Sequence, residues 1–92
     1  MTFFLALMLA ARAPQPKTVS LDVKDEDVVS ILRSMQKQCA VKNLVIDKDV
    51  QGKGTFLFRQ LPCDRAFDVV FETMSLRAKT YHSVVNVSPR SK

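Results

Sequence analysis

Two segments of this chain carry apolar residues at helical spacing, and short segments of extended character lie before, between and after them. The first stripe consists of Val28, Ile31, Leu32, Met35 and Cys39. The second consists of Cys63, Ala66, Phe67, Val70, Phe71 and Met74. Each stripe covers one side of a helix and has to be buried against another layer of the fold. With 92 residues, the chain has room for one domain that contains both helices.

The segments around the helices predict short strands. Residues 18–23 alternate between apolar and polar side chains, as a half-buried strand does. Further strands are expected at 43–47, 55–59, 77–81 and 83–87. The order β, α, β, β, α, β, β predicts an α+β domain in which two antiparallel helices pack on one or more small mixed β-sheets.

The ends of these elements indicate how they are connected. Asp25 precedes the first helix and is expected to cap its N-terminus. Pro62 stands at the start of the second helix, where its missing N–H group costs nothing. The two glycines of residues 52–54 permit a tight connection. We therefore expect the strands at 43–47 and 55–59 to pair as an antiparallel hairpin with a long loop.

The N-terminus has the character of a secretory signal. Residues 3–11 form an unbroken apolar run, too short for a membrane-spanning helix, which needs about 20 apolar residues. Ala11 and Ala13 supply small residues at the two positions that a signal peptidase reads. We predict export, with residues 1–13 as signal peptide and 14–18 as a proline-containing linker. A hydrophobic first helix of the fold stays open as the alternative, because no Lys or Arg precedes the run and a proline follows the cleavage position.

The net charge of +5 is spread along the chain, with no two basic residues adjacent to each other. A solvated surface explains such a distribution. The alternative is a small basic cytoplasmic domain that binds nucleic acid through Lys53, Arg59 and Lys79. In that alternative, Phe56 and Phe58 stack on bases from one strand face. We consider nucleic acid the weaker alternative, because Phe residues that alternate on a strand are typical of a core.

Cys39 and Cys63 are the two cysteines of the chain. If the helices are antiparallel, Cys39 at the end of the first and Cys63 at the start of the second lie at the same end of the domain. A disulfide is one interpretation, and it would add about 3 kcal/mol by restricting the unfolded chain. Two buried, reduced thiols that pack as small apolar groups are the other. The sequence does not choose between them.

No constellation for catalysis is evident. His82 is the single histidine, far along the chain from either cysteine. One His and two Cys without short spacing do not form a tetrahedral metal set. The loop at 47–52 begins like a calcium loop but lacks the acidic residue at its far end. We therefore predict that the chain is not an enzyme, uses no cofactor or metal, and has no small-molecule substrate.

Three stretches carry a family likeness, at 19–32, 43–55 and 61–68. They are similar, in order, to an opening strand with acidic turn and helix, a second strand with a D-x-D-V-x-G loop, and a V-P-x-x-x-A-L helix entry. The chain thus resembles the short amino-terminal (STN) domain of bacterial secretins and TonB-dependent transducers. Ala40 and Val41 stand where a glycine usually follows the first helix of that family.

The resemblance implies an exported periplasmic adaptor, associated with the outer membrane, that works by protein contact in secretion, pilus assembly or signal transduction. It implies a cell-envelope partner, namely a secretin, an inner-membrane secretion or pilus component, or an anti-sigma regulator. The domain would span 19–88, followed by a polar tail at 89–92. Whether the chain forms homo-oligomers, and whether it is free-standing or a fragment, stays open.

An exposed sheet edge and the outer helix faces are the expected contact surfaces of such an adaptor. Polar residues predicted to lie on the outer helix faces are the candidate partner contacts. They are Arg33, Lys37, Arg65, Asp68 and Glu72.

Overall fold

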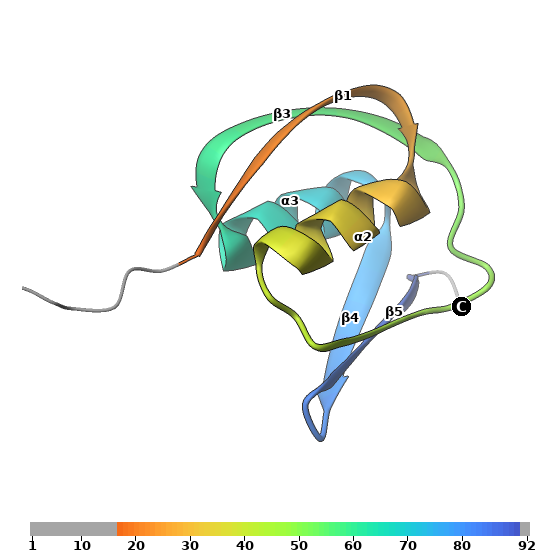
Figure 1. Ribbon diagram of the computed structural model, residues 1–92. Helices are drawn as coiled ribbons and strands as arrows, with labels where there is room; N and C mark the ends of the chain where they lie inside the picture. Colours follow the sequence, from red (N-terminus) through yellow and green to blue (C-terminus); the bar gives the residue numbers. More distant parts are fainter. Residues whose placement is uncertain (1–16, 91–92) are drawn as a thin grey trace, which may run out of the picture.

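A middle layer of two helices lies between two small β-sheets in the computed structural model of the protein, which describes residues 17–90 (Figure 1). The elements are β1 (Thr18–Asp27), α2 (Val28–Gln38), β2 (Asn43–Ile46), β3 (Lys53–Pro62), α3 (Cys63–Thr73), β4 (Leu76–Tyr81) and β5 (Val84–Pro89). The helices run antiparallel, so the expected α+β class and its element order are confirmed. The expected signal peptide lies outside the described residues. Neither helix within 17–90 is long and apolar enough to cross a bilayer.

The strand pairing differs from the expected hairpin. β3 pairs with β1 in an antiparallel two-stranded sheet, and β2 pairs in parallel with β5, which also pairs antiparallel with β4. β2 and β3 therefore belong to different sheets, and the prediction that they pair with each other is wrong. The physical reason is burial: the helix layer has two apolar sides, and separating these strands covers both. The buried Val50, between β2 and β3, joins the same core.

Two irregularities bend the long β1–β3 ribbon over the helices. Its register shifts between Val19 and Leu21 and again between Val23 and Glu26. A residue with positive φ lies in each place, Gln60 at 52° on β3 and Asp25 at 51° on β1. The backbone N–H of Gln60 donates to Ser20 Oγ at 3.1 Å, and that of Asp25 donates to Thr55 Oγ1 at 3.0 Å. Hydroxyl groups of the partner strand thus satisfy the N–H groups that the bulges take out of the ladder.

The N-cap of α2 is Asp27, not the expected Asp25. β1 continues to Asp27, whose Oδ2 accepts a hydrogen bond from the Ser30 N–H at 3.3 Å. Asp25 lies two residues too early, within the bulge. Strand pairing to Lys53 extends β1 past the point where its alternation ends, and this pairing is not visible in the local sequence.

One apolar core joins the three layers. Its buried residues come from both sheets, both helices and the loop after β2: Val19, Leu21, Val28, Ile31, Leu32, Met35, Leu44, Val50, Phe56, Ala66, Val70, Leu76 and Val87. The helical stripes expected from the sequence supply Ile31, Leu32, Met35 and Val70 among the most deeply buried. Both faces of the helix layer are therefore packed, which fixes the directions in which the remaining side chains point.

The β4–β5 hairpin projects beyond the helices (Figure 1). Its two turn residues, His82 and Ser83, have φ values of 47° and 66°, the mark of a type I′ turn. Residues 77–83 are all exposed, although alternate residues of this segment face the helix side. The outer part of β4 is thus left without cover from α3.

Candidate functional site

His82 and the two cysteines are the described residues that the sequence analysis considered for catalysis. Within 17–90, no three His, Cys, Asp or Glu side chains gather where they could hold a metal ion. His82 lies at the exposed tip of the β4–β5 hairpin, where its ring contacts Tyr81 with centroids 4.4 Å apart. The cysteines do not supply a nucleophile, because they are bonded to each other.

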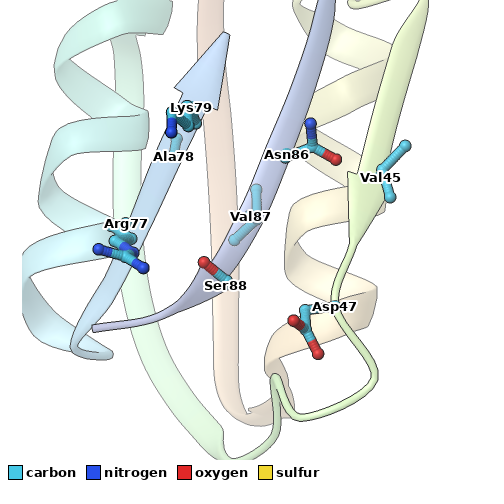
Figure 2. A pocket seen from close by; sticks show the side chains of 8 residues that line it. All are labelled: Val45, Asp47, Arg77, Ala78, Lys79, Asn86, Val87 and Ser88. Atoms are coloured by element: carbon cyan, nitrogen blue, oxygen red, sulfur yellow. The ribbon is translucent and has the colours of Figure 1, made fainter. Parts of the chain in front are cut away.

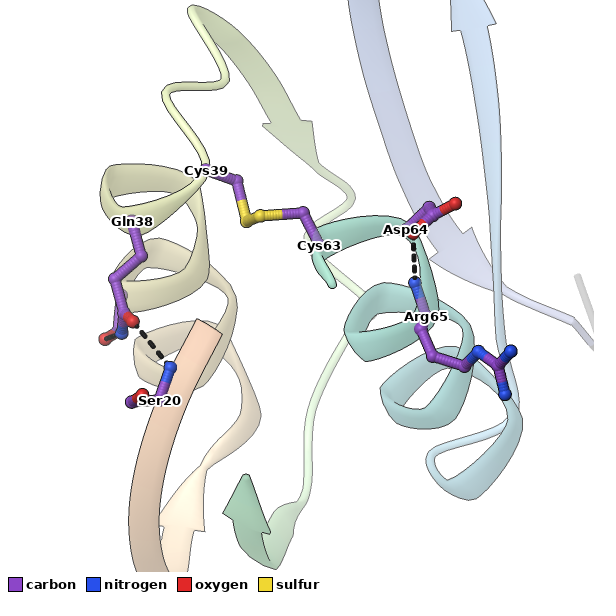
Figure 3. The surroundings of a disulfide bond; sticks show 7 residues. Ser20, Gln38, Cys39, Cys63, Asp64 and Arg65 are labelled. Atoms are coloured by element: carbon purple, nitrogen blue, oxygen red, sulfur yellow. Dashed lines mark hydrogen bonds between the residues drawn. A yellow bond between two sulfur atoms is a disulfide. The ribbon is translucent and has the colours of Figure 1, made fainter. Parts of the chain in front are cut away.

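A disulfide joins Cys39 to Cys63 (Figure 3). It ties the C-terminal end of α2 to the first residue of α3, with Cα atoms 6.0 Å apart and a sequence separation of 24. Of the two interpretations that the sequence allowed, the structure has the bonded one. The bridge holds the ends of the two antiparallel helices together at the edge of the core, against which both cysteines pack.

The candidate contacts on α2 lie together on its exposed side. Arg33 and Lys37 line a shallow hollow with Val29, Ser30 and Ser34. Arg33 also has an internal role, because its Nη1 donates to the backbone oxygen of Leu44 at 3.2 Å and to Gln36 Oε1 at 3.0 Å. Of this pair, Lys37 is the one for which no role within the domain is evident.

The candidate contacts on α3 lie on the other side of the molecule. Asp68 and Glu72 line a hollow between α3 and β4, together with Phe71, Leu76, Arg77, Ala78 and Arg90. Glu72 forms an ion pair with Arg90 at 2.9 Å, with the two side chains 71% and 49% exposed. Arg65 extends along the outside of the first turn of α3 (Figure 3).

The five predicted residues do not form one surface. α2 and α3 occupy a single layer, and their exposed sides look in opposite directions. Arg33 and Lys37 belong to the β2 side, whereas Asp68 and Glu72 belong to the β4 side. A single partner strand or helix would meet one set or the other.

The outer face of the three-stranded sheet is a surface that sequence reasoning missed. Val45, Asn86 and Lys79 lie in one row across β2, β5 and β4 (Figure 2). A shallow hollow over this face is lined by Val45, Asp47, Arg77, Ala78, Lys79, Asn86, Val87 and Ser88. Only the parallel pairing of β2 with β5 brings these residues together. The one available signal was the alternation of Arg77, Lys79 and Tyr81.

The residues of the nucleic-acid alternative are also separated. Phe56 is buried, and Phe58 packs beside it with ring centroids 5.6 Å apart, as part of the core and its surroundings. Phe56 is thus covered by the core, and Phe58 is partly buried beside it. Lys53 and Arg59 lie on β3, in one sheet, and Lys79 lies on β4, in the other.

Known proteins with similar sequences are pilus proteins. The chain is 32% identical over 80 residues to the type IV pilus biogenesis and competence protein PilQ of Neisseria meningitidis, an alignment that covers 82% of this chain and 10% of PilQ. PilQ of Neisseria gonorrhoeae matches at the same identity, with 11% of its length covered. The chain thus spans about a tenth of the length of these relatives. No protein-family model matches it.

Solved structures of other proteins share the fold of this chain. The N0 domain of the type II secretin from enterotoxigenic Escherichia coli superposes with a TM-score of 0.67 and 18% identity, covering 80% of this chain and 96% of that domain. The chain has the fold of a secretin N-terminal domain. The N-terminal domain of the secretin XcpQ from Pseudomonas aeruginosa agrees, with a TM-score of 0.65, 15% identity, and 79% and 36% of the two chains covered. These likenesses support the secretin part of the expected resemblance.

Proposed function

We propose that this chain is an exported protein–protein interaction domain that serves a secretion or pilus-assembly machine of the bacterial cell envelope. The sequence similarity to PilQ carries the proposal, because it extends over 82% of the chain. The secretin N-terminal fold supports it independently. The architecture agrees with this proposal, since the described residues form a packed apolar core and the polar side chains lie outside it.

The disulfide supports a periplasmic location. Disulfides form and persist in oxidising compartments such as the bacterial periplasm and are rare in the cytosol. Cys39 and Cys63 meet at the end of the helix pair, where a bridge limits the freedom of a small domain. Together with the apolar run at 3–11, this pairing favours export.

The partner we propose is a protein of the same envelope machine, either an outer-membrane secretin or an inner-membrane component. We favour these over an anti-sigma regulator, because the relatives are a pilus protein and secretins. The exposed residues Lys37 on α2 and Arg65 and Asp68 on α3 are proposed contacts. Arg33 and Glu72 remain candidates that also bond within the domain.

The mass of the mature protein from its native host tests export and the disulfide together. We expect a chain that lacks residues 1–13 and is lighter by two hydrogens than its reduced form. A full-length, reduced chain recovered from the cytoplasm would contradict the proposal.

Deletion of the gene tests whether the protein serves a secretion or pilus-assembly machine. We expect the deletion to impair secretion or pilus assembly, scored by exported protein in the medium and by surface pili. Restoration by the full chain supplied from a plasmid is the control. Unchanged secretion and piliation in the deletion strain would count against the proposed function.

A further inference from the structure

The strand edges on the α2 side and on the α3 side differ in whether side chains bond to their backbone groups. On the α2 side, both outermost strands are held by side chains of that helix. Gln38 Oε1 accepts the backbone N–H of Ser20 on β1 at 2.8 Å, and Arg33 Nη1 donates to the Leu44 oxygen on β2 at 3.2 Å. An edge whose backbone groups are occupied is a poor template for another strand. On the α2 side, each of these two strands thus has one backbone group already bonded to a side chain of the helix.

β4 is the outermost strand of its sheet on the α3 side. The two-residue turn makes Tyr81 and Val84 a hydrogen-bonded pair, and the pairs Lys79–Asn86 and Arg77–Ser88 follow at alternate positions. The backbone groups of Ala78 and Thr80 must then point away from β5. The Asp47 N–H that donates to the Val87 oxygen at 2.9 Å fits this alternation, since Val87 faces β2.

The edge formed by Ala78 and Thr80 is open. Both residues are exposed, and within residues 17–90 no other strand or side chain bonds to this edge. β3, the outer strand of the other sheet, is interrupted by the bulge at Gln60, which protects an edge. Among residues 17–90, the edge of β4 at Ala78 and Thr80 is thus an open edge without a bulge, and a further strand fits there.

We propose that β4 binds an extended segment of the protein partner, which adds a fourth strand beside Ala78 and Thr80. This inference rests on the proposed function and names the surface and the chemistry of the partner. The segment would lie along the hollow between α3 and β4, with its backbone hydrogen-bonded to the open edge.

The charges on β4 determine which side chains the bound segment can carry on its outer face. Arg77 and Lys79 of β4 lie on the outer face of the sheet (Figure 2), Tyr81 shares this face by alternation along the strand, and β4 contains no acidic residue. Oppositely charged neighbours on adjacent strands stabilise a sheet, and like charges destabilise it. The partner strand therefore carries carboxylates on this face. A second copy of β4 fits poorly, because it would bring its own Lys79 toward Lys79 of the first copy.

On the helix-facing side of β4, the surroundings favour small or apolar side chains in the bound segment. Ala78 and Thr80 face that side, and the hollow at the base of β4 includes Phe71 and Leu76. The same hollow contains Asp68, and it contains Glu72 already paired with Arg90. The fitting partner is thus an extended segment in which acidic residues alternate with apolar ones.

A blocked peptide of alternating Asp and Val residues is the probe, added to the ¹⁵N-labelled full-length chain at low salt. We expect amide hydrogen exchange at Ala78 and Thr80 to slow at least tenfold at saturating peptide, with no change at Leu44 and Ile46 on β2. A peptide of the same composition, with all Asp before all Val, is the control. Unchanged exchange along β4, or equal slowing by the control peptide, would overturn the inference.

Charge variants sharpen the test. Lys79→Glu should weaken binding of the Asp–Val peptide roughly fivefold, and should bind a Lys–Val peptide instead. Lys48→Glu, an equal change in the exposed loop after β2, should leave both affinities as in the wild type. Lys79→Glu with unaltered preference between the two peptides would refute the charge argument.

The variants also separate this inference from the proposed function. If the gene deletion impairs secretion or piliation and Lys79→Glu restores it as fully as wild type, the β4 inference falls while the function stands. If Lys79→Glu fails to restore it and Lys48→Glu succeeds, the inference is supported. An unimpaired deletion strain would remove the basis of both.

Discussion

At the scale of single residues, several positions hold a backbone conformation that their side chains disfavour. Ala40 and Ser75, which follow the C-caps of α2 and α3, both have φ of 55°. After α2, the N–H of Val41 donates to the Gln36 oxygen at 3.0 Å and that of Ala40 to the Lys37 oxygen at 3.3 Å. This is the Schellman arrangement, whose left-handed residue is usually glycine.

Ala40→Gly should therefore raise the free energy of unfolding by about 1 kcal/mol, because glycine adopts this conformation without the cost that a Cβ imposes. Ala66→Gly, the same chemical change inside α3, should lower it by about 1 kcal/mol. Urea denaturation of both variants with the disulfide intact gives the comparison. Equal destabilisation by the two would contradict the assigned backbone at Ala40.

The N-cap of α2 gives a second prediction at this scale. Asp27→Ala should cost about 1 kcal/mol, since it removes the oxygen that accepts the Ser30 N–H. Asp25→Asn is the matched control, because Asn keeps the tolerance for positive φ and Asp25 does not cap the helix. Unchanged stability of Asp27→Ala in urea denaturation would contradict the assigned cap.

At the scale of elements, local pattern identified nearly every helix and strand, but not which strands pair. The stripes of α2 and α3 and the alternation of β1 follow from neighbours in the sequence. The pairing of β2 with β5 depends on residues 41 positions apart, such as Leu44 and Val85. A segment containing Gly52 and Gly54 is compatible with a hairpin and equally with a crossing between layers, so the local signal was ambiguous.

The candidate site was predictable to a similar extent. The helical pattern placed Lys37, Arg65 and Asp68 on the exposed surface. It did not show that α2 and α3 present their polar sides in opposite directions, nor that Arg33 reaches the edge of β2. Both depend on how the layers stack. The open edge of β4 was likewise invisible, because an edge is defined only once the order of strands is known.

At the scale of the whole molecule, a small three-layer core is reinforced by one covalent link between its two helices. Replacing both Cys39 and Cys63 by Ser should lower the free energy of unfolding by about 3 kcal/mol, as expected for a loop of this length. Reduction should destabilise the wild type by a similar amount and leave the double variant unchanged. Equal urea midpoints for oxidised and reduced wild type would show that the bridge does not support the fold.

The central claim is that this domain works in the envelope by touching another protein. Photo-crosslinking in the native host tests it most directly, with a photoreactive amino acid placed singly at Thr80 on β4, Lys37 on α2 or Arg65 on α3. The account predicts a crosslinked species at Thr80 that contains a protein of the secretion or pilus machine. Uncrosslinked, monomeric chain at all three positions, in cells that are actively secreting or assembling pili, would contradict it.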